Sequence, residues 1–111
     1  MKKFILLLGI ALIGVSCIIK DPKPEDCVIQ TETIINIKEG TSFDIVFSDS
    51  HGDHYYINRG LERGLNLDSL NAKVLNKSVN LHLAKVLGGL VISEHITQLS
   101  VDDAIIFTEF N

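Results

Sequence analysis

The sequence predicts a mainly β protein: a small antiparallel barrel or sandwich of about five to six strands with one short helix, preceded by a signal peptide. From residue 27 onward, apolar residues recur with a period near two, which is typical of half-buried strands. Glycine, asparagine and aspartate separate these alternating stretches, as turns require. The chain of 111 residues is long enough for one small domain.

Residues 1–16 have the three-part layout of a secretory signal. Two lysines at positions 2 and 3 are followed by an apolar stretch, and the small residues Gly14 and Ser16 end it. The uncharged run 4–19 has 16 residues, slightly fewer than the roughly 17 needed to cross a bilayer. We therefore expect an exported protein rather than a membrane-spanning helix.

Cys17 is expected to decide how the leader is processed. The segment Gly14-Val15-Ser16-Cys17 resembles the lipobox of bacterial lipoproteins, although Gly14 stands where leucine is usual. The resemblance implies lipidation of Cys17 and a membrane partner reached through the lipid anchor. Because Ile18 rather than aspartate follows the cysteine, the resemblance favours the outer membrane over the inner membrane of the cell envelope.

An ordinary signal peptidase offers an alternative route, since Gly14 and Ser16 also suit cleavage before Cys17. The product would be a soluble periplasmic or secreted domain with a Cys17–Cys27 disulfide. In both cases the Pro-rich stretch 17–27 is predicted to be a solvated tether. The β domain is then expected over residues 28–111.

The first predicted hairpin joins the alternating stretches 33–38 and 42–47. A three-residue connection at 39–41 places four apolar side chains on one face, whereas a two-residue connection would set them against polar ones. The expected facing pairs are Ile37–Phe43 and Ile35–Ile45.

A third strand is predicted after a five-residue loop at 49–53. This loop length pairs apolar residues on both strands and makes the first three strands a meander. The expected facing pairs are Phe47–Tyr55 and Ile45–Ile57.

One short helix is predicted over residues 68–75, with Asp68 as its N-cap and Asn76 as a left-handed stop. About two turns of helix are unstable alone. We therefore expect this helix to lie against the sheet or to close the end of a barrel.

A fourth strand is predicted from the alternation of Val79, Leu81 and Leu83, and the pair Gly88-Gly89 ends it. The final hairpin joins 95–101 to 104–110 through a two-residue turn at Asp102-Asp103. Its expected neighbours are Leu99–Ile106, Val101–Ala104 and His95–Phe110. On this pattern His82 is expected to be exposed on the polar side of the fourth strand.

The order of these elements resembles the OB-fold class, in which a helix precedes the last strands of a small, partly open barrel. A β-sandwich is the alternative. The resemblance is architectural and implies no function by itself.

The charge of the chain disfavours nucleic acid as a partner. Its formal net charge is −4, and removal of residues 1–16 would leave eight basic residues against 14 acidic ones, a net charge of −6. Phosphate backbones are bound chiefly by lysine and arginine. Oligonucleotide or oligosaccharide binding would also lack aromatic platforms beyond Tyr55 and Tyr56.

A metal site is one interpretation of the segment 49–54, which contains Asp49, His51, Asp53 and His54. These residue types bind zinc, and a bound metal would make the protein a metal-assisted hydrolase. The simpler interpretation is a hairpin turn, because aspartate, serine and glycine suit positive φ and local hydrogen bonds.

Two further segments are candidate binding sites. Arg59 and Arg63, each beside a glycine, are spaced to clamp a carboxylate or phosphate, unless they only line a solvated loop. The stretch 86–92 surrounds a flexible glycine pair with aliphatic residues, among them Leu87, Leu90, Val91 and Ile92. It is expected either to close the barrel end as core or to bind a partner as a mobile apolar lip.

No arrangement of catalytic residues can be recognised in the sequence, and no cofactor is expected. The sequence therefore predicts a lipid-anchored envelope protein with a small non-enzymatic binding domain and an envelope protein as its partner.

Overall fold

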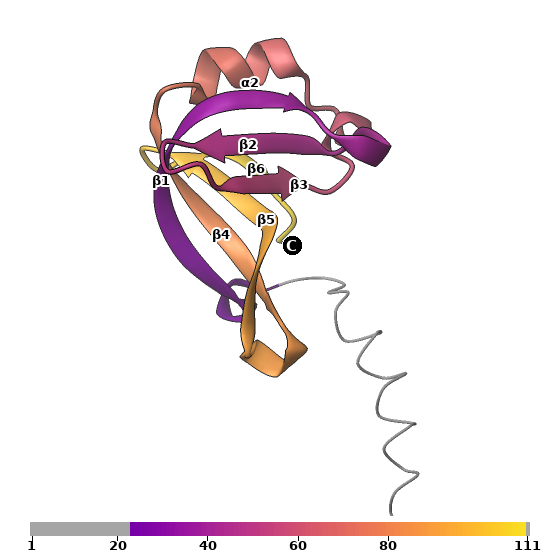
Figure 1. Ribbon diagram of the computed structural model, residues 1–111, viewed down its shortest axis with the longest axis vertical. Helices are drawn as coiled ribbons and strands as arrows, with labels where there is room; N and C mark the ends of the chain where they lie inside the picture. Colours follow the sequence, from indigo (N-terminus) through magenta and orange to yellow (C-terminus); the bar gives the residue numbers. More distant parts are fainter. Residues whose placement is uncertain (1–22, 111) are drawn as a thin grey trace, which may run out of the picture.

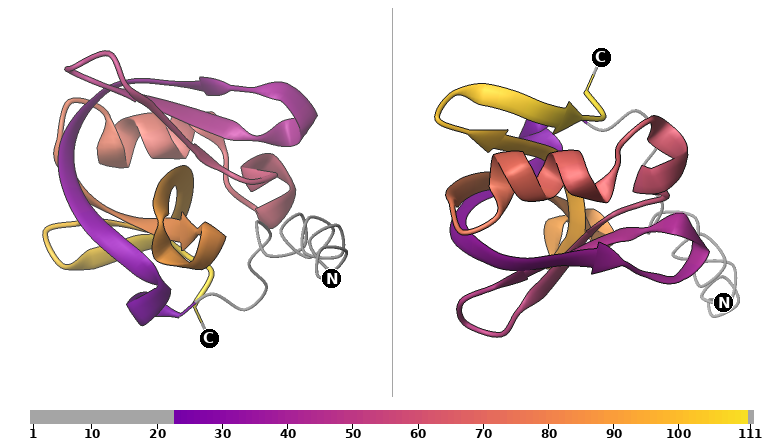
Figure 2. Two further views of the ribbon diagram at one scale, coloured as in Figure 1. Left: turned by 60° about the horizontal axis from the view of Figure 1, so that its bottom comes forward. Right: turned by 90° about the horizontal axis from the view of Figure 1, so that it is seen from above.

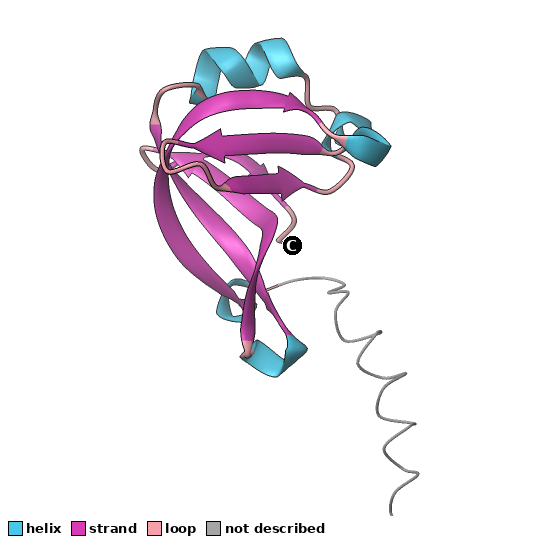
Figure 3. Cartoon of the chain, in the orientation of Figure 1, coloured by secondary structure: helices cyan, strands magenta, loops and turns pink. Residues whose placement is uncertain are grey.

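Six strands, one α-helix and four short 3-10 turns lie within residues 23–110, the part of the chain that the computed structural model describes. The expected signal peptide and Cys17 lie outside these residues. Figures 1 and 3 show the arrangement of the elements. The strands are β1 (Cys27–Glu39), β2 (Ile45–Asp49), β3 (His54–Ile57), β4 (Ser78–Val86), β5 (Val91–Val101) and β6 (Ala104–Thr108), and the helix is α2 (Leu67–Val74).

The sheet closes into a barrel through its outer strand β3. The strand order is β3-β2-β1-β4-β5-β6, and β3 also pairs with β5 in parallel at Tyr56 and His95. Five strands thus form a closed barrel, and β6 continues the sheet along β5. With the helix between β3 and β4, this is the OB-like barrel that the sequence predicted, and the sandwich alternative is wrong.

Strand β1 serves both halves of the barrel. Residues 27–33 pair with β4 and residues 34–39 pair with β2, with a register shift between Ile34 and Asn36. Such a bulge bends a strand and changes which side chains face inward. As a result Ile34 is fully buried, while Ile35, which was expected inside, is 51% exposed.

The predicted three-residue connection between β1 and β2 is wrong. Ile37 faces Phe47 rather than Phe43, and the chain turns over five residues that include the 3-10 turn Thr41–Phe43. The amide of Gly40 donates to the carbonyl of Asp44 at 2.8 Å, which closes this wider turn. Phe43 is left half-exposed with a positive φ. The second hairpin follows the prediction, with the pairs Phe47–Tyr55 and Ile45–Ile57.

Helix α2 lies across one end of the barrel, as Figure 2 shows from above. Leu70 and Val74 point into the core. The N-cap is Asn66, not the expected Asp68, because the Asn66 side chain accepts a 2.7 Å hydrogen bond from the amide of Ser69. Asn76 has φ of 62°, as expected of a left-handed stop.

The last hairpin has the expected turn but a different register. Val101 faces Ala104 across Asp102-Asp103, both of which have positive φ. A register shift after Leu99 then sets Leu99 against Phe107 instead of the expected Ile106. His95 is not paired with Phe110 as expected: its ring meets Tyr56 edge to face, and its Nε2 lies 3.1 Å from the carboxylate of Glu109. The ring of Phe110 contacts His82 instead, edge to face at 5.5 Å.

Buried aliphatic and aromatic side chains from every strand and from α2 form one core. Inward residues alternate along β4 as predicted, while the outward His82 is only partly exposed. The core consists of Ile34, Ile37, Ile45, Phe47, Tyr55, Ile57, Leu70, Val74, Val79, Leu81, Leu83, Ile96, Leu99 and Phe107. Its continuity makes the barrel a rigid platform for the loops at its two ends.

Candidate functional site

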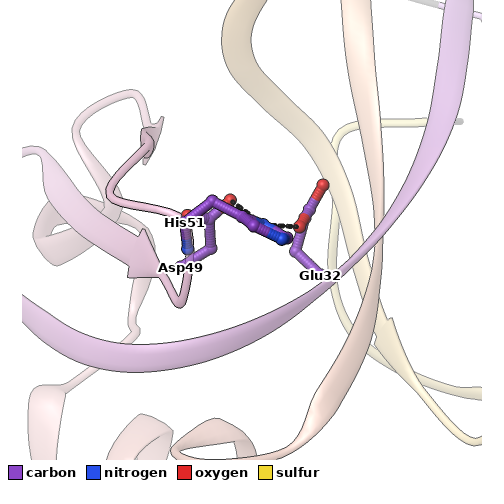
Figure 4. Close-up of side chains that lie close together, drawn as sticks. All are labelled: Glu32, Asp49 and His51. Carbon is purple, nitrogen blue, oxygen red and sulfur yellow. Dashed lines mark hydrogen bonds and ion pairs between the residues drawn. The ribbon is translucent and has the colours of Figure 1, made fainter.

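The loop between β2 and β3 brings two of the expected metal ligands together with one that the sequence did not reveal. Nδ1 of His51 lies 3.3 Å from Oε1 of Glu32 and 4.0 Å from Oδ2 of Asp49 (Figure 4). One ligand atom from each residue lies within 4.8 Å of the other two. Glu32 lies on β1, and only the pairing of β1 with β2, which sets Ile34 opposite Asp49, brings it here.

Asp49 is fully buried, and the hydrogen bonds that it accepts hold the loop. Its Oδ1 accepts from the amides of His51 and Asp53, both at 2.9 Å, and its Oδ2 accepts from the Tyr55 hydroxyl at 3.1 Å. Burial raises the pKa of Asp49, but these three hydrogen bonds outweigh it and bring the pKa below the usual 3.8. The carboxylate is therefore charged and already satisfied by protein donors.

The same network continues onto β1. Nε2 of Gln30 donates to Glu32 at 2.8 Å and to the Tyr55 hydroxyl at 3.0 Å. Burial and the hydrogen bond to Asp49 raise the pKa of Tyr55, so its hydroxyl remains a donor. The network therefore joins β1, β2 and β3, and it fits a structural role.

The other two expected ligands do not join this group. Asp53 is exposed, and its carbonyl accepts a hydrogen bond from the amide of Asp49. Nδ1 of His54 lies 2.7 Å from the hydroxyl of Ser48. Within the described residues the group has three members, and one of them, His51, has a side chain that is 73% exposed. A structural zinc site takes four ligands.

The two candidate arginines are engaged by neighbouring groups. Arg59 forms an ion pair with Glu62 at 2.6 Å, and this hydrogen bond lowers the pKa of Glu62. Nε of Arg63 donates to the carbonyl of Asn58 at 2.8 Å, and its guanidinium lies 3.6 Å from Glu109. An incoming anion would have to displace these partners, so the geometry does not favour an anion clamp.

The apolar stretch 86–92 forms the tip of the long β4–β5 hairpin, at the bottom of Figure 1. Leu90 is 86% exposed, and Val91 and Ile92 are also exposed, while Leu87 is half-buried. Gly88 and Gly89 have positive φ, and nothing lies near where a Cβ would stand. The alternative that this stretch closes the barrel as core is therefore wrong for Leu90, Val91 and Ile92.

Cys27 begins β1 opposite Ala84 and is partly buried. Its Sγ lies 3.2 Å from Oγ1 of Thr97. Burial raises the pKa of the thiol, which leaves it a weak nucleophile at neutral pH. Pro24–Asp26, expected to be tether, form a 3-10 turn that leads directly into the strand.

The outer face of β2 and β3 carries a shallow depression that involves Tyr56. Tyr55 belongs to the core, so of the two tyrosines Tyr56 offers the accessible ring, and it meets His95 edge to face at 5.5 Å. A single ring is a poor platform for stacking successive bases. The depression is lined by Thr41, Asp44, Val46, His54, Tyr55, Tyr56 and Glu94.

No family model, no curated protein and no solved structure matches the chain. Within residues 23–110 no helix is both long enough and apolar enough to cross a bilayer.

Proposed function

We propose that this protein is a lipid-anchored cell-envelope protein whose small barrel is a non-enzymatic binding module. The observation that carries the proposal is the apolar tip, which we define as Leu87, Leu90, Val91 and Ile92 at the end of the β4–β5 hairpin. Three of these side chains are exposed next to one another on a rigid barrel. Contiguous exposed aliphatic residues are typical of a surface that binds something.

The tip gains free energy when its side chains are covered. Burial of a leucine, isoleucine or valine side chain is worth about 1.5–3 kcal/mol relative to leaving it in water. Three neighbouring side chains therefore offer several kcal/mol to a binding partner. The other exposed large apolar residues of the described part of the chain are separated from one another in the sequence, and single exposed apolar residues are ordinary. They are Ile29, Ile35, Phe43 and Ile105.

The anchor is proposed from Cys17 at the end of the leader. Two or three acyl chains, at about 0.8 kcal/mol per buried CH₂, make such an attachment effectively permanent. The absence of aspartate after Cys17 supports placement in the outer membrane. The barrel would then be held beside the bilayer by the short stretch between Cys17 and β1.

Membrane fractionation of bacteria that express the full chain tests the anchor. Wild type and Cys27→Ser are expected in the membrane fraction, and Cys17→Ser is expected to leave it. Cys27→Ser is the matched control because it removes the other cysteine. If all three proteins fractionate with soluble protein, the anchor does not exist and the soluble, disulfide-closed alternative gains support.

The rival function is a metal-assisted hydrolase that uses the group Glu32, Asp49 and His51. Its specific support is the proximity of the three ligand atoms. Against it, Asp49 already accepts three hydrogen bonds. Metal analysis of the purified protein separates the two functions, since less than about a tenth of an equivalent of bound metal would leave the hydrolase without a means of activating water.

A further inference from the structure

The apolar tip lies at the same end of the barrel as the start of β1. Cys27 pairs with Ala84 near the end of β4, and the 3-10 turn Pro24–Asp26 packs beside β4. Figures 1 and 3 show this turn and the tip together at one end, with α2 at the other. An anchor attached shortly before Lys23 would therefore lie at the end of the barrel that carries the tip.

The length of chain between Cys17 and Lys23 limits how far this end can stand from a lipid anchor. Six residue steps separate the two, and a fully extended chain covers at most about 3.5 Å per step, or about 20 Å in all. If Cys17 carries acyl chains in a bilayer, Lys23 is within that distance of the surface.

The hairpin that ends in the tip carries little charge of its own, and the acidic residues at this end are Glu94 on β5 and Glu25 and Asp26 in the 3-10 turn beside β4. The chain as a whole is acidic, yet residues 69–93 contain no aspartate or glutamate. Residues 79–93 contain one charged residue, Lys85, which pairs with Ile92 just behind the tip. A lysine at this depth can extend to anionic headgroups while the aliphatic side chains enter the apolar region.

The shape of the tip also favours lipid over a folded partner. It is the convex end of a hairpin, with aliphatic side chains around two glycines and no polar side chain from residue 86 to residue 92. Contacts between folded proteins add hydrogen bonds around an apolar centre. Insertion into lipid needs no such directional contacts.

We infer that the apolar tip inserts into the interfacial region of the bilayer that holds the acyl chains, so that the barrel is fixed at two points. This inference rests on the proposed lipid anchor at Cys17. Two attachments would orient the barrel, with α2 and the β1–β2 turn directed away from the membrane. The lipid-facing residues are Leu90, Val91 and Ile92, and Lys85 contacts headgroups.

A tryptophan placed in the tip tests the inference, because the chain contains no tryptophan of its own. Leu90→Trp puts one indole in the tip, and Phe43→Trp puts one in a half-exposed turn beyond the other end of β1. Both full-length proteins are expressed in a bacterium, extracted and reconstituted into phosphatidylethanolamine and phosphatidylglycerol vesicles. A fraction of the lipid carries bromine on its acyl chains, which quenches indoles that enter the bilayer.

The inference predicts that the Leu90→Trp indole is quenched at least threefold more strongly than the Phe43→Trp indole and that its emission shifts to shorter wavelength on reconstitution. Equal, weak quenching of the two indoles in acylated protein overturns the inference and leaves the anchor standing. A concentration-dependent shift without lipid also overturns it, because a second copy would then cover the tip.

The intact mass of the same samples keeps the two proposals apart. An unacylated mass contradicts the anchor, and the lipid-dependent quenching of Leu90→Trp is then measured with that protein added to vesicles. Quenching under these conditions supports insertion of the tip by itself. Its absence overturns both proposals together.

Discussion

Replacement of Asp49 is expected to destabilise the barrel strongly, because this buried carboxylate accepts three hydrogen bonds. Hydrogen bonds to a charged group are each worth about 1.5–3 kcal/mol. The two backbone donors lie in an exposed loop, where water can replace part of what is lost. We therefore expect Asp49→Ala to reduce the free energy of unfolding by about 3 kcal/mol, a large share of the roughly 5–15 kcal/mol typical of a domain.

Asp49→Asn is the matched control. Its amide oxygen can still accept from the His51 and Asp53 amides, and the Tyr55 hydroxyl can turn to accept from the new amide nitrogen. The expected loss is about 1 kcal/mol. Urea denaturation at neutral pH measures both variants, and a loss of 3 kcal/mol corresponds to a midpoint lower by about 1–3 M.

The dependence on pH follows from the lowered pKa of Asp49. A carboxyl group whose pKa is lower in the folded state adds stability above its unfolded pKa, near 3.8, and this contribution disappears as the pH falls through the folded value. Wild type should therefore lose its advantage over Asp49→Asn below about pH 4. If Asp49→Ala costs less than about 0.5 kcal/mol, or if a chelator lowers the midpoint of wild type, the structural role assigned to this network is refuted.

Three further predictions concern stability and can be measured by thermal or urea unfolding. Gly60→Ala should cost about 1–3 kcal/mol, because its Cβ would lie 2.7 Å from Cδ1 of Ile45; an unchanged midpoint would contradict this close approach. Asn66→Ala should cost about 1 kcal/mol through loss of the helix cap, and Asp68→Ala should cost less; equal losses would argue against Asn66 as the N-cap. Burial lowers the pKa of His82, so the unfolded chain binds the proton more tightly and stability should fall as the pH drops through 6.5. His82→Leu should remove that slope, and a slope that persists would locate the titrating group elsewhere.

The sequence predicted the architecture because the alternation of apolar and polar residues marks each strand even where its turns and pairing differ from the expected ones. Ile37, Ile45 and Phe47 face the core as expected, although Ile37 meets Phe47 and not Phe43. The error is a shift of four residues in the pairing, and an even shift keeps each side chain on its own face. The alternation thus determines on which face of the sheet a side chain lies, whereas the length of the turn determines which residue of the next strand lies opposite it.

The bulges could not be predicted from alternation. Ile35 is an extra residue on β1 and faces outward, and Ile106 is an extra residue on β6, so that Leu99 pairs with Phe107. In both pairs of strands the curvature of the closed barrel determines where the hydrogen-bond register shifts. That curvature depends on strands far away in the sequence. The pairing of β3 with β5 at Tyr56 and His95 likewise depends on residues far apart in the sequence.

A candidate site could be predicted from the sequence only where the residues that form it lie close together in the sequence. The stretch 86–92 can be recognised in the sequence as a candidate, because its apolar residues surround two glycines, but only the structure shows that Leu90 is exposed rather than core. Glu32 could not be associated with Asp49, since 17 positions separate them and only the sheet brings them together. The ion pair of Arg59 with Glu62 is local, and its spacing of three residues is visible in the sequence.

The intact mass of the protein extracted from bacterial membranes, measured beside Cys17→Ser, tests the proposed function most directly. A lipid anchor at Cys17 gives a mass equal to residues 17–111 plus glycerol and its acyl chains, and Cys17→Ser is expected to lack this addition. An unmodified mass lighter by two hydrogens than the reduced chain would show Cys17 bridged to Cys27. The lipid anchor would then be wrong, and the barrel would be a secreted domain.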